Sequence, residues 1–372
     1  MSGIPGFFFK LLILAAMLLG LPLAGVFCAG LPVSRFLEFP PKTHYVRHEP
    51  FSWVVFVLYA LLIAVCVAPF ILKALKTRKA VQSPIRPKPF PWWGWLGVIL
   101  SALAWILAWT RLPWFAAFQP HTFTPLWAAF IVVINGLCYR QSGHCMLLDR
   151  PVFFLLLFPI SSAFWWFFEY LNRFVQNWYY IGPELSSWRY FWFATLPFST
   201  VLPAVLGLRD WMMSSRRLRQ SFDCFWPLRV PFPRVLAVLT LTLSACGLAG
   251  IGIWPNMLFP LLWVAPLLIL LSLQALLREP HIFSGLREGN WSEVMAAALA
   301  AIVCGLFWET WNFYSLAKWK YAVPYVQRFP VFEMPLLGYA GYLPFGLECA
   351  VVGSLLTAAG VGAETKKDAP HL

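Results

Sequence analysis

The sequence predicts an all-α protein that crosses a membrane about ten times, and three observations lead to this prediction. Of its 372 residues, 60% are hydrophobic and only 12% are charged, which excludes an ordinary water-soluble surface. Apolar stretches of spanning length recur along the whole chain. Lysine and arginine also gather in alternate connecting segments, as they do in multi-pass membrane proteins.

Each predicted helix is a run of mainly apolar residues that is long enough to cross a bilayer. The first run has one nearby lysine, Lys10, and no cleavage site of small residues precedes the next run. We therefore interpret it as a membrane anchor, not as a cleaved signal peptide. The ten expected spans are 6–30, 51–72, 92–110, 123–139, 151–174, 190–208, 235–254, 257–277, 294–316 and 335–359.

The basic residues indicate the orientation, because positive charge is retained on the cytoplasmic side of a membrane. With both termini in the cytoplasm, nineteen of the 28 lysines and arginines fall in cytoplasmic segments and nine on the opposite side. We therefore expect a multi-pass protein of a cell membrane, the bacterial inner membrane in particular. The net charge of +13 is explained by this topology and by attraction to membrane lipids with anionic headgroups, so nucleic acid is not expected as a partner.

The sequence predicts no metal and no cofactor. It has no glycine-rich nucleotide motif, and its eight cysteines show no metal-ligand or redox spacing. The nearest approach is Cys138 with His144 and Cys145, but zinc sites have tighter and more repeated spacing. We interpret the cysteines as small core residues.

Two stretches of the chain resemble each other and suggest an internal duplication. A shift of 140 residues places Glu169 on Glu309 and Asn172 on Asn312, within FWWFFEYLNRFVQNWYY and GLFWETWNFYSLAKWKY. We expect two parallel four-helix repeats, related by an axis along the membrane normal, behind a two-helix prefix. The expected divisions are a prefix at 1–91, repeats at 92–208 and 235–359, a basic linker at 209–234 and a polar tail at 360–372.

The paired glutamates, Glu169 and Glu309, are the leading candidates for chemistry. An ionised carboxylate within a spanning helix costs several kcal/mol unless it is paired, hydrated or protonated. Asn172 and Asn312 lie three residues on, share the helix face of each acid, and could hold either its charged or its neutral form. Aromatic rings also collect at membrane interfaces in proteins of any function, so an aromatic belt with a glutamate that reaches water is the alternative.

Two further acids belong to the last span. Glu348 is expected near the middle of the bilayer, just after Pro344 and Gly346, where irregular backbone could line a cavity. Its counterpart in the first half is Gly207, and pairing with a neighbouring helix is the structural alternative. Glu333 opens the span, where an acid is often only a helix-end effect.

The segment from Trp319-Lys-Tyr321 to Phe329-Pro330-Val-Phe-Glu333-Met-Pro335 resembles the integral-membrane lycopene cyclase domain and the related membrane-bound terpene cyclases. This resemblance covers at most 150–210 and 300–355. It implies Glu169 and Glu309 as proton donors or their supports, with Glu333 where that domain often has paired acids. The chain departs from this family in its acids and in its number of spans. It has one acid at this place in the second half, and Trp192 stands there in the first half. Ten spans are expected, whereas the family usually has six or seven.

Three functions are therefore open. The first is a cofactor-free, acid-catalysed cyclase or isomerase of an isoprenoid, such as a carotenoid, or of another lipid. The second is a proton-coupled transporter or flippase of a lipid-linked substrate, and the third is a structural membrane partner. For the enzyme we expect both glutamates in one ring-lined chamber, whose substrate-binding residues are Asn172, Asn312, Trp178, Tyr180, Trp308, Trp319 and Tyr321. The oligomeric state is left open.

Overall fold

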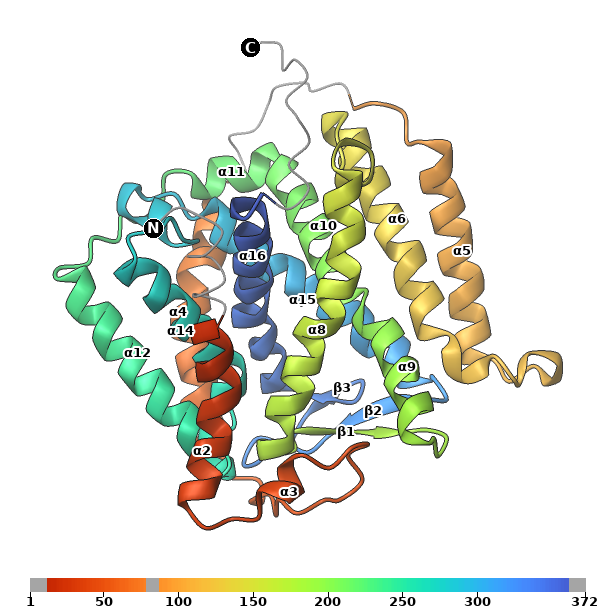
Figure 1. The fold of residues 1–372 in the computed structure, drawn as a ribbon. Coiled ribbons are helices and arrows are strands. Elements are labelled where there is room, and N and C mark those ends of the chain that lie inside the picture. Colours follow the sequence, from red (N-terminus) through yellow and green to blue (C-terminus); the bar gives the residue numbers. More distant parts are fainter. Residues whose placement is uncertain (1–11, 78–86, 361–372) are drawn as a thin grey trace.

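A computed structural model describes residues 12–77 and 87–360, and this part of the chain is a bundle of helices with two very small sheets (Figure 1). Eight helical segments in these ranges are long and apolar enough to cross a membrane. Two further apolar segments, Leu12–Cys28 and Leu261–Leu276, are shorter. Each expected span therefore coincides with an apolar helical segment, and eight of these have full spanning length. The start of the first span, the loop at 78–86 and the tail at 361–372 lie outside the described residues.

The elements of the described chain are, in order, η1 Ala16–Gly20, α2 Leu21–Cys28, α3 Val33–Phe36, α4 Trp53–Lys76, α5 Trp92–Trp109, η3 Pro113–Phe115, η4 Gln119–His121, α6 Phe123–Ser142, α7 Met146–Asp149, α8 Pro151–Val175, β1 Trp178–Ile181, α9 Ser187–Phe198, α10 Val201–Ser214, α11 Arg216–Phe222, α12 Pro233–Gly250, α13 Pro255–Leu258, α14 Leu261–Leu276, η5 Ser284–Glu288, α15 Ser292–Phe313, β2 Lys318–Tyr321, β3 Pro330–Val331, β4 Met334–Pro335, η6 Leu336–Gly341 and α16 Tyr342–Ala358.

The core of the bundle is built around α10, which packs against α6, α8, α15 and α16. Its first eight residues, 201–208, are all buried. Between α15 and α16 the backbones approach closely: a Cβ added to Gly346 would meet the carbonyl oxygen of Ala297 at 2.2 Å. Small residues commonly allow such close packing of helices in membranes. On opposite sides of the core, α5 packs on α6 and α12 packs on α14 (Figure 1).

Two short strands close one end of the bundle, each shortly after a long helix. Helix α8 ends where Gln176 adopts a left-handed conformation, and β1 follows at Trp178. Helix α15 is followed by β2, and the two strands pair antiparallel, with Trp178 opposite Tyr321 and Tyr180 opposite Trp319. The pairing brings together the two sequence stretches that resemble each other.

The segment between α3 and α4 covers the same end of the bundle (Figure 1). The Gln176 side chain accepts hydrogen bonds from the N–H groups of Tyr45 and Val46 at 2.9 and 2.8 Å, and donates one to the carbonyl of Thr43 at 2.8 Å. Arg173 bonds to Glu38 at 3.2 Å. These contacts tie the covering segment to the end of α8.

Candidate functional site

A cavity of about 340 Å³ lies at this end of the bundle, and many aromatic side chains, most of them from α8, β1, α9 and β2, line it together with the cations Arg173 and Lys318. Among the described residues that line it, Glu169 is the only carboxylic acid. Pockets that hold small ligands are typically apolar, with a few precisely placed polar groups. The cavity therefore has the composition of a binding site for an apolar molecule.

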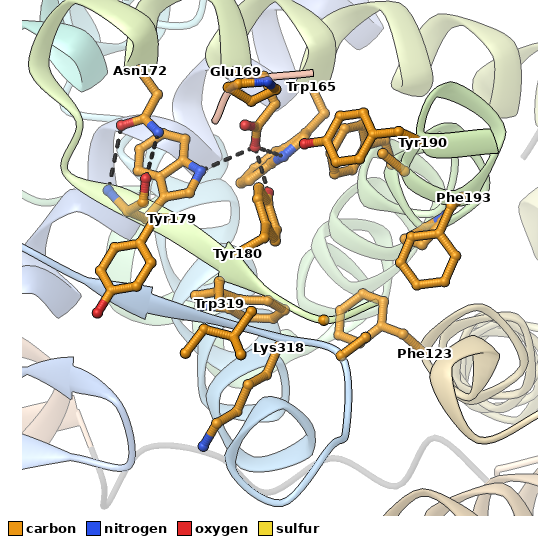
Figure 2. A pocket seen from close by; sticks show the side chains of 18 of the residues that line it. Phe123, Trp165, Glu169, Asn172, Tyr179, Tyr180, Tyr190, Phe193, Lys318 and Trp319 are labelled. Carbon is orange, nitrogen blue, oxygen red and sulfur yellow. Dashed lines mark hydrogen bonds between the residues drawn. The ribbon is translucent and has the colours of Figure 1, made fainter. Parts of the chain in front are cut away.

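Three side chains fix one oxygen of Glu169 (Figure 2). Oε1 accepts hydrogen bonds from Nε1 of Trp165 and Nε1 of Trp178, both at 3.0 Å, and from the hydroxyl of Tyr180 at 2.5 Å. Trp165 lies one helical turn before Glu169 and so shares its face of α8. Trp178 and Tyr180 are alternate residues of β1, whose side chains point to the same side of the strand.

The second oxygen, Oε2, has a different environment. It accepts no hydrogen bond from the described residues. Unlike Oε2 of Glu309 and Oε2 of Glu348, it is not among the fully buried oxygens that lack a partner. The nitrogen of an indole can only donate, so Trp165 and Trp178 require Oε1 to act as an acceptor. A proton carried by this carboxyl is therefore placed on Oε2. The hydroxyl of Tyr190, from α9, points toward the same group (Figure 2).

Glu309 repeats part of this arrangement but is sealed from the cavity. Its Oε1 accepts from the hydroxyl of Tyr321 at 2.6 Å and from that of Tyr342 at 3.0 Å. Nε1 of Trp319 donates to the Tyr321 hydroxyl at 2.8 Å. Glu309 has no exposed surface, and its buried Oε2 has no partner among the described residues. The expected shared chamber thus contains Glu169, whereas Glu309 stands behind two tyrosines that line it.

The two asparagines bind backbone and not the glutamates. Asn172 donates to the carbonyl of Trp178 at 2.8 Å and accepts from its N–H at 3.4 Å. Asn312 makes the same pair of bonds with Trp319, both at 2.9 Å. The expectation that the asparagines orient the carboxyls is therefore wrong. After each helix the chain turns into a strand, and the asparagine amide pairs with peptide groups at the start of that strand. Asn172 also lines the cavity, and Asn312 does not.

Glu333 and Glu348 lie apart from the cavity wall. Glu333 lies in the hairpin between β3 and β4, not at the start of a helix, and its carboxylate pairs with Lys318 at 2.5 Å. Glu348 is buried in α16 against the backbone of Leu267 in α14, and its Oε2 lacks a partner among the described residues. Neither acid lines the cavity that holds Glu169, although Lys318, the partner of Glu333, does.

The other aromatic candidates belong to the wall. Trp178, Tyr180, Trp308, Trp319 and Tyr321 all line the cavity. Sequence reasoning missed three wall residues that face the acids: Trp165, Tyr190 and Tyr342. The spacing of four residues between Trp165 and Glu169 was a usable signal. Tyr342 offered none, because it reaches Glu309 from another helix.

Beside the cavity, Glu38 of the covering segment and Arg173 of α8 form a partly buried ion pair. The pKa of Glu38 is lowered, chiefly by the hydrogen bond from the backbone N–H of Thr43 at 2.9 Å. The Thr43 hydroxyl, the N–H of Lys42 and the Arg173 charge add to this effect, while partial burial opposes it. The carboxylate is thus held ionised at neutral pH.

At the opposite end of the bundle, Cys138 and Cys145 are buried free thiols, and His144 lies 3.3 Å from Asp149. No group of three or more metal-ligating side chains occurs within 12–77 and 87–360. Comparison of the chain with protein-family models, with curated proteins and with solved structures finds no match. The interpretation of the site therefore depends on its geometry.

Proposed function

We propose that this protein is a membrane-embedded enzyme that transfers a proton between Glu169 and the unsaturated end of an isoprenoid or similar lipid. One observation carries the proposal: a carboxyl has one oxygen held by three donors and the other left unbonded in a cavity rich in aromatic side chains. The donors fix its orientation before a ligand arrives, and such preorganisation is what acid catalysis needs.

The reaction class follows from these groups. The proton on Oε2 adds to one carbon of a double bond, whose π electrons form the new C–H bond, and the neighbouring carbon becomes cationic. Faces of the surrounding rings attract a cation without attacking it. Attack by a second double bond closes a ring, or the cation stays open. Loss of a proton from an adjacent carbon to the Glu169 carboxylate then forms a double bond and restores the acid. The product is an isomer of the substrate.

We further propose that the helices form two parallel repeats, 92–208 and 235–359, behind the prefix at 1–91. The equivalent bonds of Asn172 and Asn312 support this division, as does the pairing of the strand after α8 with the strand after α15. The flanking pairs α5–α6 and α12–α14 correspond in the same way. The resemblance to membrane-bound lycopene and terpene cyclases agrees with an acid of this kind, and it suggests an isoprenoid substrate.

A proton-coupled transporter would need a relay that includes Glu348. That carboxyl lies against α14 and does not line the cavity of Glu169. The enzyme is therefore the function that the geometry favours.

Expression of the wild type in a bacterial host grown in ordinary water, followed by incubation of the isolated membranes in ²H₂O, tests the proposal. The acid adds its proton to carbon and exchanges with solvent between turnovers, so we expect an isomer of a precursor lipid with a changed retention time and added deuterium. Glu169→Gln keeps the shape and the acceptor oxygen but has no proton to give, so the new lipid should fall by at least about a hundredfold. The matched control is Glu293→Gln, at an exposed acid at the start of α15, which should behave as wild type.

The same lipid profile in hosts with and without the wild-type protein would contradict the proposal. So would a new lipid that Glu169→Gln still produces in full. Movement of a lipid across the membrane without added deuterium would support a transporter.

A further inference from the structure

The Tyr190 side chain is held by its ring and not by its hydroxyl. Tyr190 lies in the first turn of α9, and its ring packs against Phe39 of the covering segment and Trp166 of α8, with ring centroids 5.6 and 6.3 Å away. The hydroxyl makes no hydrogen bond with the described residues, and it is not among their fully buried atoms that lack a partner. In Figure 2 this hydroxyl points toward Glu169. A packed ring thus presents its hydroxyl to the acid within the cavity.

Hydrogen bonds between α8 and α9 fix the position of Tyr190 relative to the acid. Nε1 of Trp166 donates to Oγ1 of Thr195 at 2.9 Å, and the hydroxyl of Ser162 donates to the carbonyl of Thr195 at 3.0 Å. Trp166 and Ser162 belong to the same helix as Glu169, and Thr195 belongs to the same helix as Tyr190. The two groups are therefore placed by one pair of joined helices.

Proton transfer from Glu169 to a ligand leaves a negative charge on the carboxyl, and the described residues supply donors to only one of its oxygens. Oε1 accepts three hydrogen bonds, whereas Oε2 accepts none from these residues. A charged oxygen without a hydrogen bond in an apolar setting is costly in free energy. Oε2 therefore needs a donor as soon as it loses its proton.

Tyr190 is the cavity group suited to supply that hydrogen bond. The two cations of the wall, Arg173 and Lys318, are paired at 3.2 and 2.5 Å with acids that do not line the cavity. Figure 2 shows Lys318 extending away from Glu169. A phenol hydroxyl can rotate, and it can either accept or donate a hydrogen bond. Tyr190 can therefore face a protonated Oε2 and donate to the same oxygen once it is ionised.

From these observations we propose that Tyr190 is a second catalytic residue, whose hydroxyl donates a hydrogen bond to Oε2 of Glu169 while the carboxyl is ionised. This inference rests on the proposed proton transfer and names the group that stabilises its charged stage. As the proton leaves Oε2 for a carbon of the ligand, the electron pair of the O–H bond stays on Oε2, and the Tyr190 proton stays on its own oxygen. The hydrogen bond is released when a proton returns to Oε2. A bond made only while the charge is present accelerates the chemical step without strengthening ligand binding.

The test compares Tyr190→Phe with the wild type in vesicles. The full-length proteins are reconstituted with a lipid extract of the host that lacks the protein, diluted in steps with a fully saturated, branched-chain phosphatidylcholine that offers no double bond. In ²H₂O, the rate at which the deuterated isomer forms is measured against the share of host lipid. Tyr190→Phe keeps the packed ring and removes the donor. We expect the maximal rate to fall about 10- to 100-fold, with the half-saturating share of host lipid unchanged.

The matched control is Tyr139→Phe, the same change on α6 outside the cavity, and it should keep the wild-type values. A full maximal rate in Tyr190→Phe would overturn the inference and leave the proposed function standing. An unchanged maximal rate with a raised half-saturating share would overturn it too, since Tyr190 would then serve to bind the ligand. A wild type that forms no deuterated isomer would reject the proposed function, and the role of Tyr190 would fall with it.

Discussion

The first and second halves of the bundle surround their buried glutamates with similar groups, but not with identical ones. In each half a long helix carries the acid, an asparagine one turn later binds the start of a strand, and a tyrosine of that strand donates to Oε1. The halves differ in the last ring. Glu169 faces a cavity, and Glu309 is closed off by Tyr342. The comparison teaches that similar backbone elements hold both acids, whereas the side chains around each carboxyl decide whether it meets the cavity.

The largest expected effect on stability concerns the sealed acid. Glu309→Leu leaves the hydroxyls of Tyr321 and Tyr342 without their buried acceptor, so we expect the free energy of unfolding to fall by about 2–4 kcal/mol. Glu169→Leu should lower the free energy of unfolding by only about 1–2 kcal/mol, because water in the cavity can accept hydrogen bonds from the donors that lose the carboxylate. Equilibrium unfolding in mixed detergent micelles measures both. Equal losses would mean that the two acids are equally enclosed.

A change at Gly305 probes the space that Tyr342 occupies. Gly305→Ala puts a methyl group into the Tyr342 ring and should lower the free energy of unfolding by about 1–3 kcal/mol. Gly207→Ala on α10 is the control, because its added Cβ would meet Ile134 at an ordinary 3.4 Å. That variant should stay within about 1 kcal/mol of the wild type. An undisturbed Gly305→Ala protein would show that the ring can move aside freely.

The corresponding change in the open half is Trp165→Phe, which keeps a ring and removes one donor to Glu169. Two donors remain on Oε1, so we expect a loss of about 0.5–1.5 kcal/mol. The exposed Trp192 on α9 gives a control, and Trp192→Phe should have no measurable effect. Full stability of Trp165→Phe would indicate that its hydrogen bond contributes nothing.

The smallest effect involves the ion pair that ties the covering segment to α8. The pKa of Glu38 is lower in the folded protein than in the unfolded chain, so its contribution is complete above the ordinary carboxyl pKa and is lost as the pH falls through the folded value. Glu38→Gln should lower the free energy of unfolding by about 0.2–1 kcal/mol at pH 7. The difference from wild type should vanish in acid, and unfolding measured across pH 3–7 checks this. A constant difference would exclude the carboxylate as its source.

The helical, apolar character of the fold could be predicted, because a long apolar run is a local feature of the sequence. Apolar length located the helices, whereas the two paired strands after α8 and α15 were not predicted. Two apolar segments, Leu12–Cys28 and Leu261–Leu276, are shorter than the other eight. The first begins where the described residues begin, and α14 continues through Pro266 without a break.

The site could be predicted only in part. Glu169, Trp178 and Tyr180 were identified from one continuous stretch and meet in the structure. Glu333 is instead neutralised by Lys318, a partner fifteen residues away on another strand. Pairing of that kind depends on strand register, which a single sequence does not reveal.

The sequence by itself determined that the chain is helical, apolar and suited to a membrane, and that two acids stand at matching helix positions. These properties follow from local composition and spacing, so they can be recognised without knowing which residues contact each other in the fold. Only the tertiary structure decided which acid meets a cavity, because enclosure depends on side chains from separate helices. Trp165 and Tyr342 show this most clearly: each gives a ring to its own acid, yet one arrives along the same helix and the other across the bundle.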